Sequence, residues 1–454
     1  MLLTHAHIDH SGLLPKLVRN GFAGRILATR GTIDLCSYML PDAGSIQESE
    51  VAALNRRNAS RGRAEVTPIY TQADALAALR FFTPVDYEKW VDVIPGVRAR
   101  YWNAGHLLGS ASIEIECVDG DTSPKPLASG DVGPDAKLLQ PDPEAPAGFD
   151  YIISESTYGN RERPATTPDA RRALLIPAFA VERTQELIVD LVDLMERGEV
   201  PAAPIFLDSP LAIRATEVFR KHASSLDPGV DVRRLLNSPQ LRFTETVEGS
   251  KAIAKLTGFH IVIAASGMCD AGRIRHHLKN WLWNARATVL LVGFQAQGTL
   301  GRFLVEGAKA VRLWGNEIRV AARIRSIDDY SGHADGTELA RWIAARRPIE
   351  RGLFLVHGEE PAIASLADRV SERIIPAARV SQPLLDDIYE LSAAVPAPQD
   401  VSHRRRLAPE AVVALDWHNE MSKLILDINE RVATAADDRA RGVVIRRLRR
   451  ALGE

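Results

Sequence analysis

The amino-acid sequence predicts an α/β protein with more than one structural unit. Short apolar segments alternate with helix-like segments over residues 1–172, and the alternation continues over residues 173–325 and 326–392. Side chains that bind metals well follow several of these apolar segments, and α/β folds usually place their sites at the ends of strands. With 454 residues, the chain has room for two or three domains.

The first unit is residues 1–172. Apolar residues recur at helical spacing over residues 31–39, and residues 71–80 are rich in alanine and leucine, so both segments are predicted to be helices. Residues 11–20 and 49–57 are also expected to be helical. Short apolar runs bounded by turn residues predict strands at residues 25–29, 97–103, 113–118 and 151–154.

The second unit, residues 173–325, has a different pattern. Residues 205–207, 261–264 and 288–292 are continuous apolar runs, which suit parallel strands buried on both faces. A further strand is expected at residues 174–177. Glycine-rich turns follow these runs, and their N–H groups near helix starts suit phosphate binding, although tight turns alone explain the same glycines. The substrate-binding candidates of this unit are Ser266, Gly267, Met268 and Arg302.

The third segment, residues 326–392, is expected to return to the first unit. It contains a helix at residues 336–346, a strand at 353–356 and a helix at 360–373. Residues 393–454 are expected to form a linker, marked by Pro396 and Pro398, and a helical C-terminal tail. The tail ends in the basic run 446–450, which we interpret as a solvated helix face. A contact with nucleic acid or a partner protein is the alternative.

The composition excludes several classes of protein. Apolar residues make up 46% and charged residues 25% of the chain, as in ordinary globular proteins. The net charge is −2, so nucleic-acid binding would need basic groups focused in a groove. No run approaches the roughly 18 apolar residues of a membrane span, and no signal peptide is evident. Three cysteines far apart predict no disulfide framework and a cytoplasmic location.

The N-terminal segment carries the strongest chemical signal. His5, His7, Asp9 and His10 lie within six residues of one another, and imidazole and carboxylate groups are the ligands of zinc and similar ions. His5 and His7, at alternate positions, can share one ion, while Asp9 and His10, adjacent at a bend, can turn toward a second. A solvated, histidine-rich terminus is the alternative, because a motif needs support from its context.

Further metal-binding side chains occur in turns after apolar runs. They are His106, Asp131, His333 and His357. Taken singly, each one could be a helix cap or a buried histidine satisfied by the backbone. Taken together with the N-terminal segment, they predict a binuclear site assembled from distant parts of the chain.

These residues resemble the motifs of a known family. The set His5, His7, Asp9, His10, His106 and Asp131 resembles the metal-binding signature of the metallo-β-lactamase fold. Glu155, His333 and His357 resemble the additional motifs of its β-CASP branch, whose members are nucleases that process RNA and DNA. Residues 176–186, 208–212, 265–268 and 293–302 are similar to segments of the same branch. The resemblance covers about residues 1 to 392.

The resemblance implies a fold and an assignment of the ligands to two metal ions. The fold would be a metallo-β-lactamase αββα sandwich, N-terminally short, made of residues 1–172 and 326–392, with residues 173–325 as an inserted β-CASP domain. One zinc would be held by His5, His7 and His106, and a second by Asp9, His10 and His357. Asp131 would bridge them, and Mn²⁺ could replace Zn²⁺ because the two use overlapping ligands.

The resemblance also implies a function. Two zinc ions would activate water and neutralise phosphate charge, so the chain would be a metal-dependent ribonuclease that hydrolyses phosphodiester bonds of single-stranded RNA. The catalytic residues would be Asp9, Glu155 and His333, with His333 as general acid and Glu155 as the group that keeps it cationic. Endonuclease and exonuclease modes, activity on DNA, and a monomer or homodimer all remain open.

Two alternatives remain beside this function. A small-molecule hydrolase of thioesters or lactones would share the first metal motif, but it would not explain the inserted unit or Glu155, His333 and His357. A catalytically impaired RNA-binding or scaffold protein is the other alternative. The complete ligand set argues against it, and the missing N-terminal strands argue for it.

The chain departs from the family pattern in two places. It is short between Tyr158 and Leu174, where the family usually has an additional helix. In addition, the family has strands before the first histidine motif, whereas only Met1, Leu2 and Leu3 precede it in this sequence. Three residues are too few for a stable strand. We therefore expect Met1 to be an internal residue of a longer protein.

Overall fold

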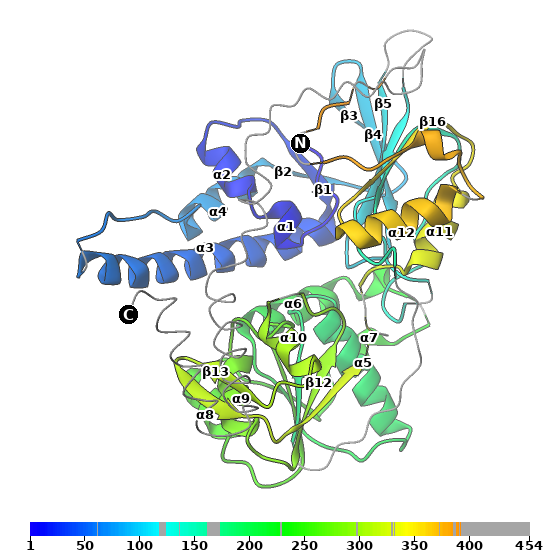
Figure 1. Cartoon of the computed structure of the whole chain (residues 1–454). Helices are drawn as coiled ribbons and strands as arrows, with labels where there is room; N and C mark the ends of the chain where they lie inside the picture. The colour runs from blue at the N-terminus through cyan, green and yellow to red at the C-terminus, as the bar shows by residue number, and fades with distance from the viewer. Residues whose placement is uncertain are drawn as a thin grey trace, which may run out of the picture.

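A computed structural model describes residues 1–391 except 61, 118–123, 136, 161–172, 228, 297, 328–329, 331, 372, 385–386 and 390. It shows an α/β fold with two large sheets, each in its own lobe (Figure 1). The linker and helical tail expected within residues 393–454 lie outside the described residues, and so does most of the short segment after Tyr158. None of the helices in the described part of the chain has the length and apolar character of a membrane span.

The first lobe is built on a mixed seven-stranded sheet. The four strands from β17 to β6 run parallel, and the rest are antiparallel. Helices α11 (Gly336–Ala344) and α12 (Glu360–Ser371) cover one face, where Leu339, Leu353 and Leu366 share a buried core. In sheet order the strands are β17 (Val380–Ser381), β16 (Ile349–Val356), β7 (Phe149–Glu155), β6 (Pro126–Ala128), β5 (Ala111–Cys117), β4 (Val97–Asn103) and β3 (Trp90–Ile94).

A small parallel pair of strands packs against the opposite face of this sheet. Strands β1 (Ile26–Thr29) and β2 (Phe82–Val85) pair in register. Leu27 and Val85 share a buried cluster with Tyr101 and Ile113 of the large sheet. The first residues of the chain extend the small sheet, because Leu3 N donates to Leu27 O at 3.0 Å and Leu27 N donates to Met1 O at 2.9 Å. The helices beside it are α2 (Leu14–Arg19), α3 (Arg30–Ala59) and α4 (Gln72–Ala78).

The second lobe contains a six-stranded sheet in which every strand pair is parallel. Its order is β10 (Leu241–Phe243), β9 (Ile205–Leu207), β11 (His260–Ala264), β8 (Ala173–Pro177), β12 (Ala287–Val292) and β15 (Arg323–Ile327). Helices α5 (Arg183–Glu196) and α6 (Pro210–Lys221) share a core with one face. Helices α9 (Ile274–Trp281) and α10 (Leu300–Val305) share a core with the other. Burial on both faces explains the continuous apolar runs, so that prediction is confirmed.

The two lobes are joined by a shared hydrophobic core. Leu35 and Leu40 of α3 belong to the same buried cluster as Leu187 of α5 and Phe219 of α6. Short elements complete the second lobe: α7 (Val232–Leu235), α8 (Val247–Ile253) and the hairpin of β13 (Ala310–Leu313) and β14 (Asn316–Arg319). The structure describes all three cysteines of the sequence, and each is a free thiol.

Some local predictions were wrong. The helix expected at residues 11–20 is two short helices, α1 (Ile8–Ser11) and α2, with Pro15 in the first turn of α2, where a missing N–H is tolerated. Residues 31–39 and 49–57 are helical as expected, but the residues between them are helical too, so that both segments belong to one helix, α3, which runs through Pro41. The strands β2, β3, β6, β10, β13, β14, β15 and β17 were not predicted, because they are short and most are partly exposed.

Candidate metal centre

The candidate ligands converge at one end of the large mixed sheet. His5 and His7 lie in the loop between the first paired residues and α1. Asp9 and His10 lie within the helical turn of α1, and not at a bend of an extended loop as the sequence suggested. The remaining residues follow strand ends or precede a helix: His106 after β4, Asp131 after β6, Glu155 at the end of β7, His333 before α11 and His357 after β16.

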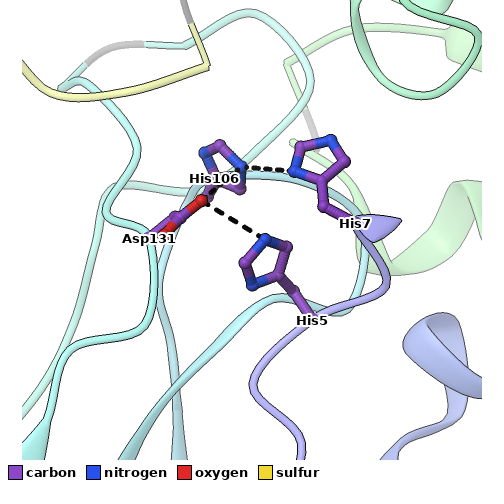
Figure 2. Close-up of side chains that lie close together, drawn as sticks. All are labelled: His5, His7, His106 and Asp131. Atoms are coloured by element: carbon purple, nitrogen blue, oxygen red, sulfur yellow. Dashed lines mark hydrogen bonds and ion pairs between the residues drawn. The ribbon is translucent and has the colours of Figure 1, made fainter. Parts of the chain in front are cut away.

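The inner cluster consists of His5, His7, His106 and Asp131 (Figure 2). One ligand atom from each residue lies within 4.8 Å of the others. His106 Nε2 is 3.0 Å from His7 Nδ1, and His5 Nε2 is 3.3 Å from an Asp131 oxygen. The cluster is largely shielded from solvent, since His5, His106 and Asp131 are 0%, 1% and 2% exposed.

The outer cluster consists of Asp9, His10 and His357. His10 Nε2 lies 3.2 Å from His357 Nε2, and the Asp9 carboxylate lies 3.7 Å from His10 and 3.6 Å from His357. The side chains of His10 and His357 are 20% and 36% exposed, and that of Asp9 is 60% exposed. This cluster therefore faces solvent while the inner one faces the core.

Asp131 lies between the two clusters and turns one oxygen to each. Its Oδ2 is 3.3 Å from His5 and 3.5 Å from His106. Its Oδ1 is 3.4 Å from His10 and 3.6 Å from His357. A carboxylate with this orientation can contribute to two ions at once.

The charge states of the inner cluster suit metal binding. Burial lowers the pKa of His5, His7 and His106 below the usual histidine value, so their rings are neutral at pH 7 and can coordinate. Burial alone would raise the pKa of Asp131, but the side-chain contacts of His10 and His5 lower it well below its usual value. The carboxylate is therefore ionised.

The orientation of the rings also fits a metal. The Nδ1 of His106 donates to Gly332 O at 2.6 Å, and His5 Nδ1 pairs with Thr4 Oγ1 at 3.1 Å, so both direct their Nε2 inward. His5 Nε2 and Asp131 Oδ1 are buried without a hydrogen-bond partner among the described residues. Buried polar atoms are rarely left unpaired, and nitrogen and carboxylate ligands suit zinc. The residues present fit a metal ion.

A glutamate and a histidine form a pair beside the inner cluster. His333 Nδ1 lies 3.1 Å and 3.2 Å from the two oxygens of Glu155, which is 1% exposed. Val132 N donates to the same carboxylate at 2.5 Å and fixes its position. Burial on its own would lower the pKa of His333, but the Glu155 charge and hydrogen bond outweigh it and raise the pKa above the usual value. The Glu155 carboxylate thus favours the protonated form of His333.

The loops that carry the ligands pack closely together. A side chain at Gly133 would collide with the backbone, because its Cβ would lie 1.9 Å from Gly105 O. The loop after Asp131 can therefore lie directly against the turn that carries His106. The sequence pattern placed His106 and Asp131 in turns after apolar runs but gave no indication of this close approach, which depends on the tertiary structure.

Sequence reasoning missed residues that orient the ligands. Thr157 Oγ1 lies 3.2 Å from His357 Nδ1 and donates to His357 O at 3.0 Å. Lys137 Nζ donates to His106 O at 2.5 Å. Thr157 follows Glu155 by two residues, so its position in that motif could have indicated a role. The position of Lys137 in the sequence gives no such indication, because it lies about thirty residues from His106 and outside the quoted motifs.

The substrate-binding candidates of the second lobe lie near one another. Gly301 N, next to Arg302, donates to Met268 O at 3.0 Å, which joins the turn after β11 to helix α10. A side chain at Gly267 would contact Phe179 at 3.0 Å. Arg302 Nε donates to Glu306 at 2.7 Å on the same helix. The structure therefore brings the two candidate segments together.

Clusters of histidine and aspartate at the end of a mixed sheet, beside a glutamate–histidine pair, define a metal-dependent hydrolase. Comparison with known families agrees, because the Beta-Casp domain matches residues 184–304 and the Zn-dependent metallo-hydrolase RNA specificity domain matches residues 317–378. The chain belongs to the β-CASP family of metallo-β-lactamase nucleases that process RNA. Its β-CASP domain is inserted in the metallo-β-lactamase body.

Individual relatives support this assignment. The chain is 34% identical over 391 residues to ribonuclease TTHA0252 of Thermus thermophilus, covering 82% of this chain and 84% of that protein. It is 28% identical to an RNase J-like protein of Methanocaldococcus jannaschii, of which it covers 83%. It is 30% identical to transcription termination factor FttA of Pyrococcus abyssi, but it spans only 59% of that longer protein.

Proposed function

We propose that this protein hydrolyses phosphodiester bonds of single-stranded RNA with two zinc ions. The observation that carries the proposal is the orientation of Asp131, which turns one carboxylate oxygen toward His5 and His106 and the other toward His10 and His357. Such a carboxylate suits a pair of adjacent ions. The relationship to a ribonuclease over most of both chains supports RNA as the substrate.

Each residue of the centre has an assigned role in this proposal. His5, His7 and His106 would hold one ion, Asp9, His10 and His357 the other, and Asp131 both. Bound zinc lowers the pKa of water and neutralises charge on a phosphate. The burial of the inner histidines keeps them neutral and oriented, and the helical turn of α1 fixes Asp9 beside His10.

The chain also supplies a proton donor. A leaving 3′-oxygen needs a proton, and we assign its delivery to His333, whose side chain is 21% exposed and can reach a substrate. Glu155 keeps the ring protonated and oriented by accepting the Nδ1 hydrogen bond, which leaves Nε2 to donate. Glu155 itself is held by Val132 N, so the pair is rigid.

We also propose how the chain is divided. Residues 1–172 and 326–392 would form the αββα sandwich, residues 173–325 the β-CASP domain, and residues 393–454 a linker and tail. The layers of α3, the two facing sheets, and α11 with α12 support this division. Ser266, Gly267, Met268 and Arg302 would contact RNA from the inserted domain. The free cysteines suit a cytoplasmic location.

One experiment tests the proposal: metal analysis of the purified protein, combined with product mapping on end-labelled single-stranded RNA. We expect about two divalent ions per chain, as in other two-metal sites, and metal-dependent cleavage. Mapping from each end shows whether cuts are internal or terminal. Cleavage of a thioester with no effect on RNA would favour the small-molecule alternative. RNA binding without bound metal or cleavage would favour the impaired form.

A further inference from the structure

A group of buried charged and amide side chains lies behind the metal centre, where the two lobes meet. It consists of Lys137 from the loop after β6, Gln140, and Glu182 and Glu186 at the start of α5. These residues are 8%, 3%, 4% and 3% exposed. The proposed reaction uses none of them, yet burying charge is costly unless the charges are paired. We call this group the buried charge cluster.

The contacts of the cluster lead to the turn that carries His106, residues 105–110. Lys137 Nζ donates to His106 O at 2.5 Å. Leu108 N donates to Glu182 Oε2 at 3.0 Å. Glu182, which immediately precedes helix α5 of the other lobe, is thus bonded to the backbone two residues beyond His106. Gln140 Nε2 donates to the same carboxylate at 3.0 Å and 3.2 Å.

Lys137 also joins the two glutamates. Its Nζ lies 3.4 Å from Glu182 and 3.4 Å from Glu186. The two glutamates therefore lie equally close to the lysine, and they are similarly buried. They differ in their other partners: of the two carboxylates, as the described residues have them, Glu182 accepts from Leu108 N in the turn that carries His106 and from Gln140.

The backbone at Glu182 has an unusual conformation. Its φ is 68° and its ψ is −66°, a region that L-residues with a long side chain adopt only at a cost. Glu182 immediately precedes α5, yet in the described structure its side chain makes no capping hydrogen bond to that helix. The carboxylate is instead directed across to Leu108 N. Strained residues persist where the surrounding structure holds them, and they occur often at functional sites.

A purely structural role for the cluster explains less. Apolar side chains of similar size would fill the same space at equal or better stability, since buried ion pairs rarely add net stability. Apolar side chains could not donate to His106 O or accept from Leu108 N. The polar groups are therefore the ones needed to fix the backbone on both sides of the His106 ring, whose Nδ1 is held separately by Gly332 O.

We propose that Glu182 and Lys137 are positioning residues, through which helix α5 of the inserted domain holds the His106 turn in the geometry that binds zinc. The inference rests on the proposed zinc site. Neither side chain touches a ligand ring or the substrate. Groups that orient metal ligands from outside the coordination shell typically change metal affinity by roughly 10- to 100-fold when they are removed.

The test compares two substitutions in the full chain. Glu182→Gly removes the carboxylate bonded to Leu108 and suits the positive φ, so it relieves backbone strain. Glu186→Ala is the matched control, because it removes an equally buried carboxylate at the same distance from Lys137. Zinc affinity is measured by competition with a chromogenic chelator, and thermal unfolding of the zinc-free proteins reports on the fold.

We expect Glu182→Gly to weaken zinc binding by roughly 10-fold or more, and Glu186→Ala to change it by less than about 3-fold. RNA cleavage by Glu182→Gly should recover toward the wild-type rate as zinc is raised to saturation. Equal zinc affinity of Glu182→Gly and wild type would overturn the proposal, and so would equal losses in the two variants.

A second variant at the same position tests the proposal if Glu182→Gly does not fold. If Glu182→Gly unfolds, Glu182→Gln retains the size of the side chain and an acceptor for Leu108 N, but it loses the charge that attracts Lys137. We expect a smaller loss of zinc affinity in this variant, and an unchanged affinity would count against the proposal. If wild type binds no zinc and cleaves no RNA, the proposed function itself fails. If wild type does both and Glu182 is irrelevant to affinity, only this inference fails.

Discussion

The inner and outer clusters contain the same kinds of side chain but lie in different surroundings. His5, His106 and Asp131 are almost fully buried, whereas Asp9 and His357 are 60% and 36% exposed. Burial lowers the pKa of the inner histidines. In the outer cluster, the Asp9 carboxylate, which lies 3.6 Å from His357, raises the pKa of that histidine to about 9. Without metal, the inner rings are thus neutral at pH 7 and His357 is protonated.

This difference shows that ligand identity alone does not determine the strength of a metal site. In the inner cluster the histidines are already neutral and can coordinate an ion directly. In the outer cluster, the ion must first displace a proton from His357. Solvent also screens the exposed Asp9 carboxylate. The inner cluster should therefore bind its ion more tightly, and the outer cluster should be the one that exchanges its ion.

Asp131→Ala should have the largest effect, because this carboxylate serves both clusters. We expect loss of at least one bound ion and a fall in RNA cleavage that exceeds the roughly 10⁴-fold upper end for losing a general acid. Metal content by elemental analysis and single-turnover cleavage rates measure the two effects. A variant with wild-type metal content and cleavage rate would contradict the bridging role of Asp131.

His333→Ala should have the next largest effect without disturbing either cluster. We expect cleavage to fall by roughly 10²- to 10⁴-fold, because a proton donor is lost. Both ions should remain bound, and a substrate with a better leaving group should be partly rescued. Metal analysis of the variant is the control. If His333→Ala loses an ion, then His333 and His357 have exchanged the roles assigned to them.

Stepwise removal of metal should separate the clusters directly. A pKa of about 9 for His357 lies two units above pH 7, so proton competition and solvent screening together predict that the outer ion is held about 10- to 100-fold less tightly. A chelator titration should show two phases at pH 7. His357→Ala should abolish the weaker phase alone, and the phases should converge as the pH rises toward 9. A single phase at every pH would mean that the clusters are equivalent.

Glu155→Gln should have the smallest effect, a shift in pH dependence. Glu155 raises the pKa of His333, so the protonated acid persists to higher pH and is lost as the pH rises through that pKa. Without the anion, the pKa of His333 is no longer raised by Glu155, so the alkaline fall in kcat/KM should begin at a lower pH than in the wild type. Glutamine retains the acceptor for Val132 N, so the fold is preserved. An unmoved alkaline limb would show that His333 does not limit the rate there.

Much of the fold followed from local pattern. Strand β4 lies at the predicted residues, Val97–Asn103, and the apolar runs of the second lobe became parallel strands. The pattern failed where strands are short and half exposed, as in β2 and β3. There, pairing with neighbours that are distant in sequence decides the conformation, and local propensity is weak. The middle of helix α3 was not predicted to be helical for a related reason. The helix continues through Pro41 because of its packing and not because of local propensity.

The sequence by itself determined which kinds of side chain the candidate centre contains. The spacing of His5, His7, Asp9 and His10 indicated two ions, and Asp131, His333 and His357 could be selected because metal-binding side chains at strand ends are informative. Only the tertiary structure decided which ligands are buried, that Asp131 faces both clusters, and that Glu182 and Lys137 reach the His106 turn. The physical reason is that ligand type is a property of a residue. The burial of that residue, its pKa and its further contacts depend on which other parts of the chain pack around it.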